Sequence, residues 1–405
     1  MKVLVFTSLY PNAEFPNQGV FIRERMANFA RWSGHEVRVM APVPYFPPIK
    51  GTARWKYSQV PRRETQGGIE VFHPRYLMTP NVGMMFYGVF MFLSVLAEAI
   101  RLRRNFDFDL IDSHFVYPDG LAGVLLGRYF RKPVTVSARG SDINLYKEFP
   151  LIRRLLRYTL GKADRVIAVS RALKATMVSL GVPDRKIIVI PNGVDANKFI
   201  PLPKMKARRD LGLPQQQIVL SVGHLTPVKG FDLLIQAMKI LVKDRLYNDL
   251  FLVIVGEGPS RHKLEQLVLA LGVNEHVLLA GEVSHHLLPT WYSAADIFCL
   301  ASIREGWPNV LLESLSCGTP VLGTKVGGIP EIISSDKVGL IVDRSPEGIA
   351  DAILVALGRC WSCDSLREHA RQFTWEQVTE SLSSVFKSVL PGCGNFVQEM
   401  PVEHD

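Results

Sequence analysis

Short apolar runs alternate with longer amphipathic segments along the whole chain. Strands that are buried on both faces give near-continuous apolar runs, and their alternation with helical segments predicts parallel α/β layers. The strands predicted in the first half are Val3–Thr7, Glu36–Ala41, Ile69–His73, Leu110–Ser113, Val134–Ala138, Val166–Ser170 and Ile187–Pro191. Those predicted in the second half are Ile218–Gly223, Phe251–Val255, Val277–Ala280, Ile297–Leu300, Pro320–Gly323 and Leu340–Val342.

The two series of strands predict two domains, since 405 residues exceed one ordinary core. A proline-marked linker, Pro201–Lys206, separates the series. We expect an N-terminal domain of residues 1–198 and a second domain of residues 199–374. An amphipathic helix over residues 375–390 should cross back to the first domain, and the tail 391–405 should be disordered. Because ligands bind beyond the carboxyl ends of such strands, a cleft between the domains is the expected site.

The stretch Arg304–Pro320 combines a loop, a helix start and two carboxylates. Gly306 permits a sharp turn, and Pro308 is predicted at the first helical position, where its missing N–H costs nothing. The next backbone N–H groups would then face outward at the positive end of the helix dipole, an arrangement that suits a diphosphate. These predicted donors belong to Asn309, Val310 and Leu311.

Glu305 in this loop and Glu313 on the helix have seven residues between them. Both carboxylates can border one pocket and accept hydrogen bonds from sugar hydroxyls; taken singly, either could be a solvated surface glutamate. The whole run resembles the paired-glutamate signature of retaining glycosyltransferases of family four, group 1. Those enzymes have the GT-B fold, in which two doubly wound Rossmann-like domains face an interdomain cleft. The resemblance implies that Glu305 holds the donor sugar hydroxyls and Glu313 the ribose hydroxyls.

The first domain carries four further candidates for this site. Gly19 opens a helix after the first strand, where the backbone can approach a bound donor. His114 ends a strand and matches the family histidine near the reacting carbon, although a plain polar strand end is the alternative. Arg139 stands where relatives often have histidine. Asp142 either orients the acceptor or caps a helix.

The second domain supplies the expected diphosphate ligands. Lys229 lies at a loop-to-helix transition, where a cation can meet a diphosphate. His224 stands where the family normally has arginine, and we hypothesise that it donates to the β-phosphate. Glu282 begins the loop in which relatives contact the base, and Gly327–Glu331 should shape the loop around the nucleotide. No Gly-x-Gly-x-x-Gly follows the first strand, which counts against a dinucleotide oxidoreductase.

The net charge of +9 indicates anionic partners such as nucleotide sugars or anionic lipid surfaces. Nucleic acid is not expected, because the aromatic–basic interleaving of an RNA-binding sheet is missing. Asp107-Phe108-Asp109 mimics a metal-binding Asp-x-Asp but precedes a strand, so we interpret it as a turn and expect no metal cofactor.

No signal peptide is predicted. Cys360 and Cys363 have redox-motif spacing without the second pair that a zinc site needs, and Cys393 lies in the tail. A reduced, cytoplasmic protein is expected.

Residues Met84–Ala97 are almost uninterrupted apolar sequence, shorter than the roughly 20 residues that span a bilayer. Arg101, Arg103 and Arg104 follow. One interpretation is a buried or lid helix; the other is an interfacial helix with its basic end on anionic headgroups.

The resemblance implies transfer of a hexosyl group, with retention, from a nucleotide-diphosphate sugar to a lipid-linked or saccharide acceptor. The opening Tyr10-Pro11 with Gly19-Val20-Phe21 looks most like bacterial enzymes of cell-surface polysaccharide synthesis. A sugar-nucleotide epimerase of the same fold is one alternative. A catalytically weak binding subunit is another, given His224 and Arg139. The donor base, UDP or GDP, and the sugar stay open.

Overall fold

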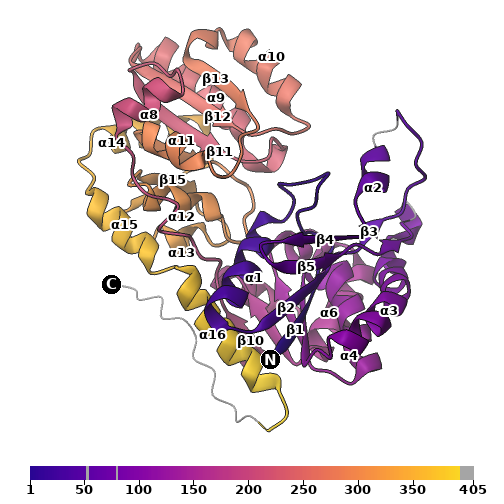
Figure 1. Ribbon diagram of the computed structural model, residues 1–405. Helices are drawn as coiled ribbons and strands as arrows, with labels where there is room; N and C mark the ends of the chain where they lie inside the picture. Colours follow the sequence, from indigo (N-terminus) through magenta and orange to yellow (C-terminus); the bar gives the residue numbers. More distant parts are fainter. Residues whose placement is uncertain (52–53, 79–80, 393–405) are drawn as a thin grey trace. The chain divides into compact units, whose positions relative to one another are not determined.

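The computed structural model describes residues 1–51, 54–78 and 81–392, and the chain forms two compact units (Figure 1). Of the described residues, unit 1 comprises 1–192 and 375–392, and unit 2 comprises Gly193–Thr374. Unit 2 therefore begins before the predicted boundary at residue 198. The reason is local pairing, because Val194 forms a parallel bridge with Thr374 and its N–H donates to the Phe373 carbonyl at 2.8 Å. Residues 393–405 of the predicted tail, including Cys393, lie outside the described residues.

Unit 1 is built on an eight-stranded sheet in the order β10-β9-β8-β7-β1-β2-β5-β4, parallel except for the β4–β5 pair. The strands are β1 (Lys2–Phe6), β2 (Glu36–Met40), β4 (Arg63–Gln66), β5 (Ile69–Phe72), β7 (Leu110–His114), β8 (Val134–Ala138), β9 (Arg165–Ala168) and β10 (Ile187–Val189). The pair β3 (Val43–Pro44) and β6 (Arg75–Tyr76) stands apart. The seven predicted strands are confirmed. Strands β3, β4 and β6 were not predicted, because they are too short or too polar to give an apolar run.

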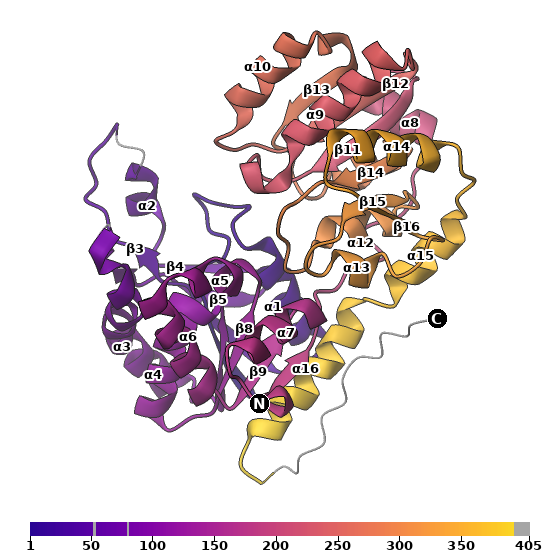
Figure 2. The same cartoon turned by 180° about the vertical axis from the view of Figure 1, so that it is seen from behind.

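Helices cover both faces of this sheet (Figures 1 and 2). On one side α1 (Val20–Ser33) packs against α16 (Trp375–Val389), with Phe29 and Phe386 edge to face. The C-terminal helix therefore belongs to the core of unit 1. On the other side α4 (Leu121–Phe130) lies between α3 (Tyr87–Asn105) and α6 (Pro150–Lys162) and contacts both. The remaining helices are α2 (Trp55–Gln59), α5 (Ser141–Asn144) and α7 (Arg171–Ser179).

Unit 2 has a six-stranded, fully parallel sheet in the order β13-β12-β11-β14-β15-β16. Its strands are β11 (Gln217–Val222), β12 (Leu250–Val255), β13 (Val277–Gly281), β14 (Ile297–Leu300), β15 (Val321–Thr324) and β16 (Gly339–Val342), which confirms all six predictions. Its helices are α8 (Lys204–Asp210), α9 (Phe231–Lys239), α10 (Arg261–Leu271), α11 (Leu288–Ala294), α12 (Asn309–Ser316), α13 (Ile329–Ile332), α14 (Pro346–Leu357) and α15 (Cys363–Arg371).

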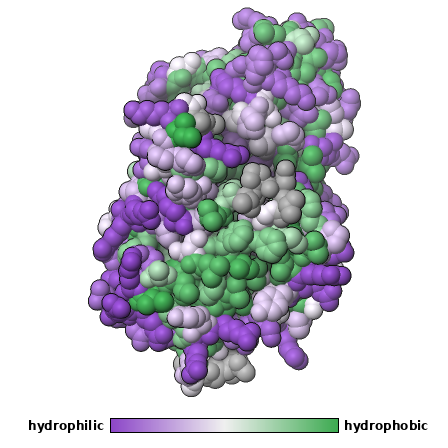
Figure 3. Space-filling model, turned by 90° about the vertical axis from the view of Figure 1, so that its right-hand side faces the viewer, coloured by the Kyte–Doolittle hydropathy of each residue, from purple (hydrophilic) through white to green (hydrophobic). Residues whose placement is uncertain are grey.

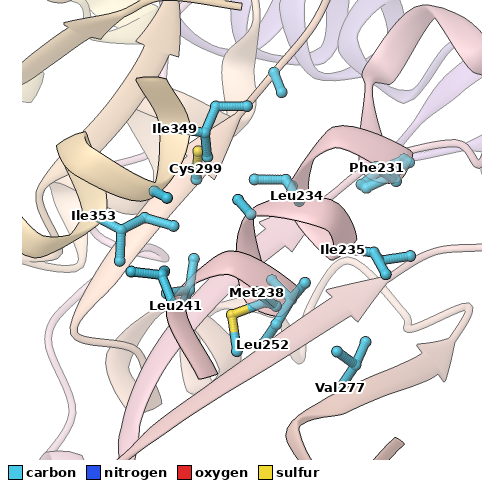
Figure 4. Close-up of a cluster of buried hydrophobic side chains, with 14 of the residues drawn as sticks. Phe231, Leu234, Ile235, Met238, Leu241, Leu252, Val277, Cys299, Ile349 and Ile353 are labelled. Atoms are coloured by element: carbon cyan, nitrogen blue, oxygen red, sulfur yellow. The ribbon is translucent and has the colours of Figure 1, made fainter. Parts of the chain in front are cut away.

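The core of unit 2 is a cluster of buried apolar side chains (Figure 4). Side chains of α9, β12 and α14 share this one cluster, among them Met238, Leu252 and Ile353, so the cluster joins the two helices to the sheet. Cys299 is buried in the same cluster, as expected for a small core residue. Cys360 and Cys363 are exposed and free, so the predicted redox spacing carries no disulfide.

Both sheets reverse their strand order at one point, between β1 and β7 in unit 1 and between β11 and β14 in unit 2. Connections leave in opposite directions at such a point, and the space beyond the carboxyl strand ends stays open for a ligand. The loops after these four strands, and the end of β7 itself, hold Gly19, His114, Lys229 and Glu305. The fold thus places the principal candidates at the switch point of their own unit.

Candidate active site

In unit 2, Lys229 and Glu305 form an ion pair at the switch point. The turn Pro227–Lys229 after β11 brings Lys229 Nζ to 2.6 Å from Glu305 Oε1. Ser302 Oγ donates to the same oxygen at 2.7 Å. The side chain of Lys229 is 24% exposed and that of Glu305 11% exposed. Glu305 Oε2 makes no hydrogen bond within the described part of the chain and is not buried. The pair is therefore held in place while part of it stays open to a ligand.

Two glycines let the neighbouring backbones approach this pair. Gly327 has φ +53°, and a Cβ there would lie 1.9 Å from the Glu305 carbonyl oxygen. Gly230 has φ +70°, and a Cβ there would lie 2.2 Å from the Ala301 carbonyl oxygen. Any side chain at either position would displace the loop that carries Glu305 or Lys229. The Gly327–Glu331 stretch therefore packs against the Glu305 loop, and its role around a nucleotide stays a prediction.

The start of α12 differs in one detail from the prediction. Pro308 (φ −81°, ψ 96°) precedes the helix, and Asn309 is the first helical residue. Proline's ring fixes φ but leaves ψ free, so the residue caps the helix in an extended conformation. Its carbonyl accepts the Leu311 N–H at 3.1 Å. Of the three predicted backbone donors, that of Leu311 is thus engaged in the first turn of the helix itself.

Glu313 is the centre of a second polar cluster in unit 2, and its side chain is largely buried. Tyr292 Oη donates to Glu313 Oε2 at 2.8 Å, and His285 Nε2 lies 3.1 Å from Oε1. Lys198 Nζ donates to His285 Nδ1 at 2.7 Å. Because lysine can only donate, His285 carries its proton on Nε2 and donates it to Glu313. Burial, reinforced by the adjacent Glu313 charge, holds the pKa of Tyr292 far above its ordinary value, so this phenol stays a donor.

Sequence reasoning missed the partners of Glu313. The signal for His285 was present, because it lies three residues after Glu282 in the loop expected to meet the base. Tyr292 lies in α11 and gives no such signal, since its position reads as an ordinary core aromatic.

The remaining donor candidates, His224 and Glu282, are exposed residues just beyond β11 and β13. The His224 carbonyl accepts the Thr226 N–H at 2.8 Å, and no ion pair or hydrogen bond of its imidazole with the described chain joins it to Lys229 or Glu305. It is free to reorient toward an anion.

In unit 1, His114 is fully buried at the end of β7. The Arg139 guanidinium donates to His114 Nδ1, so the ring proton belongs to Nε2. Nε2 lies 3.0 Å from Asp112 Oδ2, although their relative orientation is not that of a hydrogen bond. Burial is the main cause that lowers the pKa of His114 to about 4, and the Arg139 charge adds to it against the opposing effect of Asp112. His114 is therefore a neutral side chain enclosed by protein.

The charges around His114 belong to one buried network. Arg139 also donates to Asn192 Oδ1 at 2.8 Å, and Thr135 Oγ1 donates to Asp112 Oδ1 at 2.7 Å. Arg25 of α1 is buried as well, and its Nη2 donates to the Ile190 carbonyl at 3.1 Å. Burial favours the neutral form of each group, yet the carboxylate and the two guanidinium groups compensate one another. A signal for Arg25 existed: it lies on the apolar stripe of α1, three residues after Ile22.

Asp142 is committed to its own backbone. It accepts N–H groups from Val116 at 2.8 Å, Arg139 at 3.0 Å and Gly140 at 2.8 Å, and it is buried. These bonds occupy both carboxylate oxygens and fix the loop after β8 against the end of β7. Helix α5 has no side-chain cap, so Asp142 holds the preceding loop and does not cap the helix.

Gly19 begins α1 as predicted, with φ 69°, and a Cβ there would lie 2.3 Å from the Leu9 carbonyl oxygen. Asp107 and Asp109 lie in the loop before β7, as predicted, and their side chains make structural contacts there. Asp109 Oδ2 accepts the Lys2 N–H at 2.7 Å, and Asp107 pairs with Arg103 at 3.1 Å. Both lie at the amino end of β7. Among the described residues, no three His, Cys, Asp or Glu side chains gather as a metal ion would require.

Comparison with known families agrees with this geometry in both units. The family model described as "Glycosyltransferase Family 4" matches residues 18–198, and the one described as "Glycosyl transferases group 1" matches residues 204–373. A GDP-mannose-dependent alpha-(1-6)-phosphatidylinositol monomannoside mannosyltransferase of Mycolicibacterium smegmatis is 30% identical and covers 80% of each chain. The chain belongs to the group 1 glycosyltransferases of family 4.

Further similarities extend over nearly the whole chain. The teichuronic acid biosynthesis glycosyltransferase TuaC of Bacillus subtilis is 29% identical over 87% of this chain and 88% of its own. The solved sucrose-phosphate synthase of Thermosynechococcus elongatus superposes with a TM-score of 0.78 at 20% identity, covering 96% of this chain and 98% of its own. The fold is therefore GT-B, as the sequence predicted, and the protein is a glycosyltransferase.

In this glycosyltransferase, five of the predicted site residues take part in three separate groups of side-chain contacts. Lys229 and Glu305 are in contact, and His114 and Arg139 are in contact in the other unit. Glu313 instead joins two residues that were not predicted. The separation of these groups follows from the fold, because each is anchored to a different strand end or helix.

Proposed function

We propose that this glycosyltransferase moves a hexosyl group, with retention, from a nucleotide-diphosphate sugar to a lipid-linked or saccharide acceptor. We place it at the cytoplasmic side of a bacterial membrane, in exopolysaccharide or cell-envelope glycan synthesis. The observation that carries the proposal is the Lys229–Glu305 pair at the switch point of unit 2, followed three residues after Glu305 by Pro308 and the start of α12.

This arrangement supports departure of a diphosphate. When the bond between the sugar C1 and the phosphate oxygen breaks, its electron pair stays on the diphosphate, and negative charge grows there. A fixed ammonium group and a helix N-terminus stabilise that charge more in the transition state than in the ground state. We therefore assign Lys229 and the α12 N-terminus to the diphosphate and expect no metal to be required. His224, near the start of the loop that leads to Lys229, would add a further donor.

Carboxylates recognise the hydroxyl groups of the donor. Glu305 Oε2 is the acceptor left open by Lys229 and Ser302, and we assign it to the donor sugar. Glu313 is fixed by Tyr292 and His285, which orients its carboxylate for ribose hydroxyls. We expect the acceptor oxygen to attack C1 on the face that the leaving group occupied, and its proton to pass to the departing phosphate.

A pocket of about 190 Å³ in unit 1 is our candidate for the acceptor. It opens beyond the carboxyl ends of β1, β2 and β5, and its described lining contains no lysine, arginine, aspartate or glutamate. Aromatic rings and neutral polar groups dominate this lining, a composition suited to a sugar ring. They include Tyr10, Asn12, Phe15, Gln18, Tyr57 and Tyr76. Since a relative is named for a phosphatidylinositol mannoside acceptor, a lipid-linked sugar is our preferred acceptor class.

Transfer is tested by incubating the purified protein with radiolabelled UDP- and GDP-sugars and a bacterial lipid extract. We expect label in the lipid fraction. Glu305→Ala should lower the transfer rate by about 100-fold or more, because it removes a group that is held for the transition state. The matched control is Glu275→Ala, an exposed glutamate of the same unit, which should keep the parent rate.

Other outcomes separate the alternatives. A changed sugar in the free nucleotide fraction would indicate an epimerase, and no turnover with any donor would indicate a binding subunit. Full activity of a folded Glu305→Ala protein would contradict the assignment of this site.

A further inference from the structure

Helix α3 turns an apolar stripe outward instead of inward. Its buried face, which includes Gly88, Met91 and Val95, packs on α4, so the helix is part of the fold of unit 1. The stretch Gly83–Asn105 is nevertheless long and apolar enough to cross a membrane by length and composition. Four large apolar side chains of this stretch are exposed, and their spacing places them along one side of the helix. Leu93 is the most exposed of them, at 59%. They are Phe86, Val89, Leu93 and Ile100.

The stripe continues onto the rim of the acceptor pocket. Strand β6 contacts α3, and its Tyr76 lines the pocket. The exposed Leu77 follows Tyr76 directly, and the exposed Tyr45 donates its N–H to the Tyr76 carbonyl at 2.7 Å. Figure 3 shows a broad hydrophobic area on the side of unit 1 that carries α3. A continuous apolar surface of this kind on a folded domain marks an interaction site.

Basic side chains border the same helix layer. Arg101 and Arg104 end α3, and Arg153, Arg154 and Arg157 are exposed on α6, on the other side of α4. Arg101 pairs with Glu98 at 3.2 Å, whereas no ion pair within the described chain engages the other four. An apolar stripe beside unpaired arginines has the composition of a surface that lies in a bilayer interface.

We propose that the outward face of α3, with the arginines beside it, docks unit 1 onto an anionic lipid bilayer and holds the pocket rim at the membrane surface. The link to the pocket rests on the proposed transfer to a lipid-linked acceptor. A membrane-anchored acceptor would then reach the pocket by lateral diffusion, with its sugar already beyond the headgroups.

The positive charge of the arginines favours a lipid surface over a second copy of this chain as the partner of the α3 face. A two-fold dimer through this face would set the same patch against itself and bring its arginines toward one another. Like charges in such an interface oppose association. Anionic headgroups neutralise them and also accept the apolar stripe into the acyl boundary. The net charge of +9 acts in the same direction.

Vesicle flotation tests the docking surface with the full chain. The parent protein should float with phosphatidylcholine vesicles that contain phosphatidylglycerol and should stay below with phosphatidylcholine alone. Leu93→Glu places a charge at the centre of the stripe and should weaken binding by about tenfold or more. Leu269→Glu is the matched control, because Leu269 is an even more exposed leucine on α10 of unit 2. Circular dichroism melting of both variants verifies that they fold.

Three results would overturn the proposal: parent protein that fails to float on phosphatidylglycerol vesicles, equal flotation of Leu93→Glu and parent, or equal loss in both variants. Light scattering adds a fourth. A concentration-dependent dimer that Leu93→Glu abolishes would show that a second copy covers this face. Flotation requires no turnover, so it can succeed where the transfer assay fails. Conversely, Leu93→Glu should keep the parent rate toward a detergent-dispersed acceptor.

Discussion

Each unit of this glycosyltransferase carries a polar cluster at its switch point, and the two clusters are built in opposite ways. In unit 2 the Lys229–Glu305 pair is partly exposed, and one carboxylate oxygen stays open. In unit 1 the ring of His114 is sealed between Arg139 and Asp112, with no exposed surface.

The difference in burial separates recognition from architecture. The Lys229–Glu305 pair is reached by solvent and keeps one carboxylate oxygen open, so a ligand can contact it without unfolding its surroundings. A buried charge that loses its partner costs several kcal/mol, so Asp112 and Arg139 are held within the unit 1 network. We infer that unit 2 binds the donor through side chains. The His114 network instead fixes the end of β7, where the next residue, Phe115, adopts the strained φ of 70°.

Replacing Lys229 should give the largest effect on catalysis. Lys229→Met removes the ammonium group proposed for the leaving diphosphate and releases Glu305 from its partner. The loss of one such charge lowers kcat by about 10²–10³-fold in comparable sites. Initial rates of nucleoside diphosphate release measure the effect. The control Lys239→Met removes the exposed pair with Asp244 on α9 and should leave the rate unchanged. Equal rates for Lys229→Met and parent would remove Lys229 from the site.

Replacing His114 should change the pH dependence of stability before it changes the chemistry. The buried ring has a pKa of about 4 against 6.5 in the unfolded chain, so between these values only the unfolded state binds the proton. The free energy of unfolding should therefore fall as pH drops from 6.5 toward 4, by about 3 kcal/mol at most. His114→Gln keeps an acceptor and donors but cannot titrate, so its stability should decline less over this range.

Urea unfolding across this pH range measures the slopes. His262→Gln, a change of an exposed histidine on α10, should follow the parent curve. Parallel curves for His114→Gln and parent would show that His114 is not held neutral by its surroundings.

The comparison also explains what the sequence could predict. Thirteen of the fourteen strands in the two sheets were predictable, because most of them are buried and rich in apolar residues. Site residues could be predicted where they lie in a loop that follows a strand end, as Lys229 and Glu305 do. Contacts between distant segments were not, since the link from Tyr292 to Glu313 depends on how α11 packs beside α12.

The sealing of His114 was the least predictable feature. It follows from a long-range coincidence, in which Arg25 of α1, Asn192 beyond β10 and Arg139 beyond β8 converge on one strand end. Nothing in the local pattern around His114 distinguishes an enclosed ring from one that faces a ligand. The Arg139 departure from the family was visible in the sequence, but its consequence required the fold.

Replacing His224 should give the smallest effect and tests the open character of the unit 2 site. Arginine is always charged and can bind a phosphate through two donors, a paired geometry that histidine does not offer. If His224 contacts the diphosphate, His224→Arg should tighten donor binding by about threefold to tenfold. Calorimetric titration with UDP and GDP at one pH measures the change. His262→Arg adds the same charge on α10 and controls for a general electrostatic effect. Equal affinity of His224→Arg and parent would exclude His224 from the diphosphate and leave Lys229 and the α12 N-terminus as its ligands.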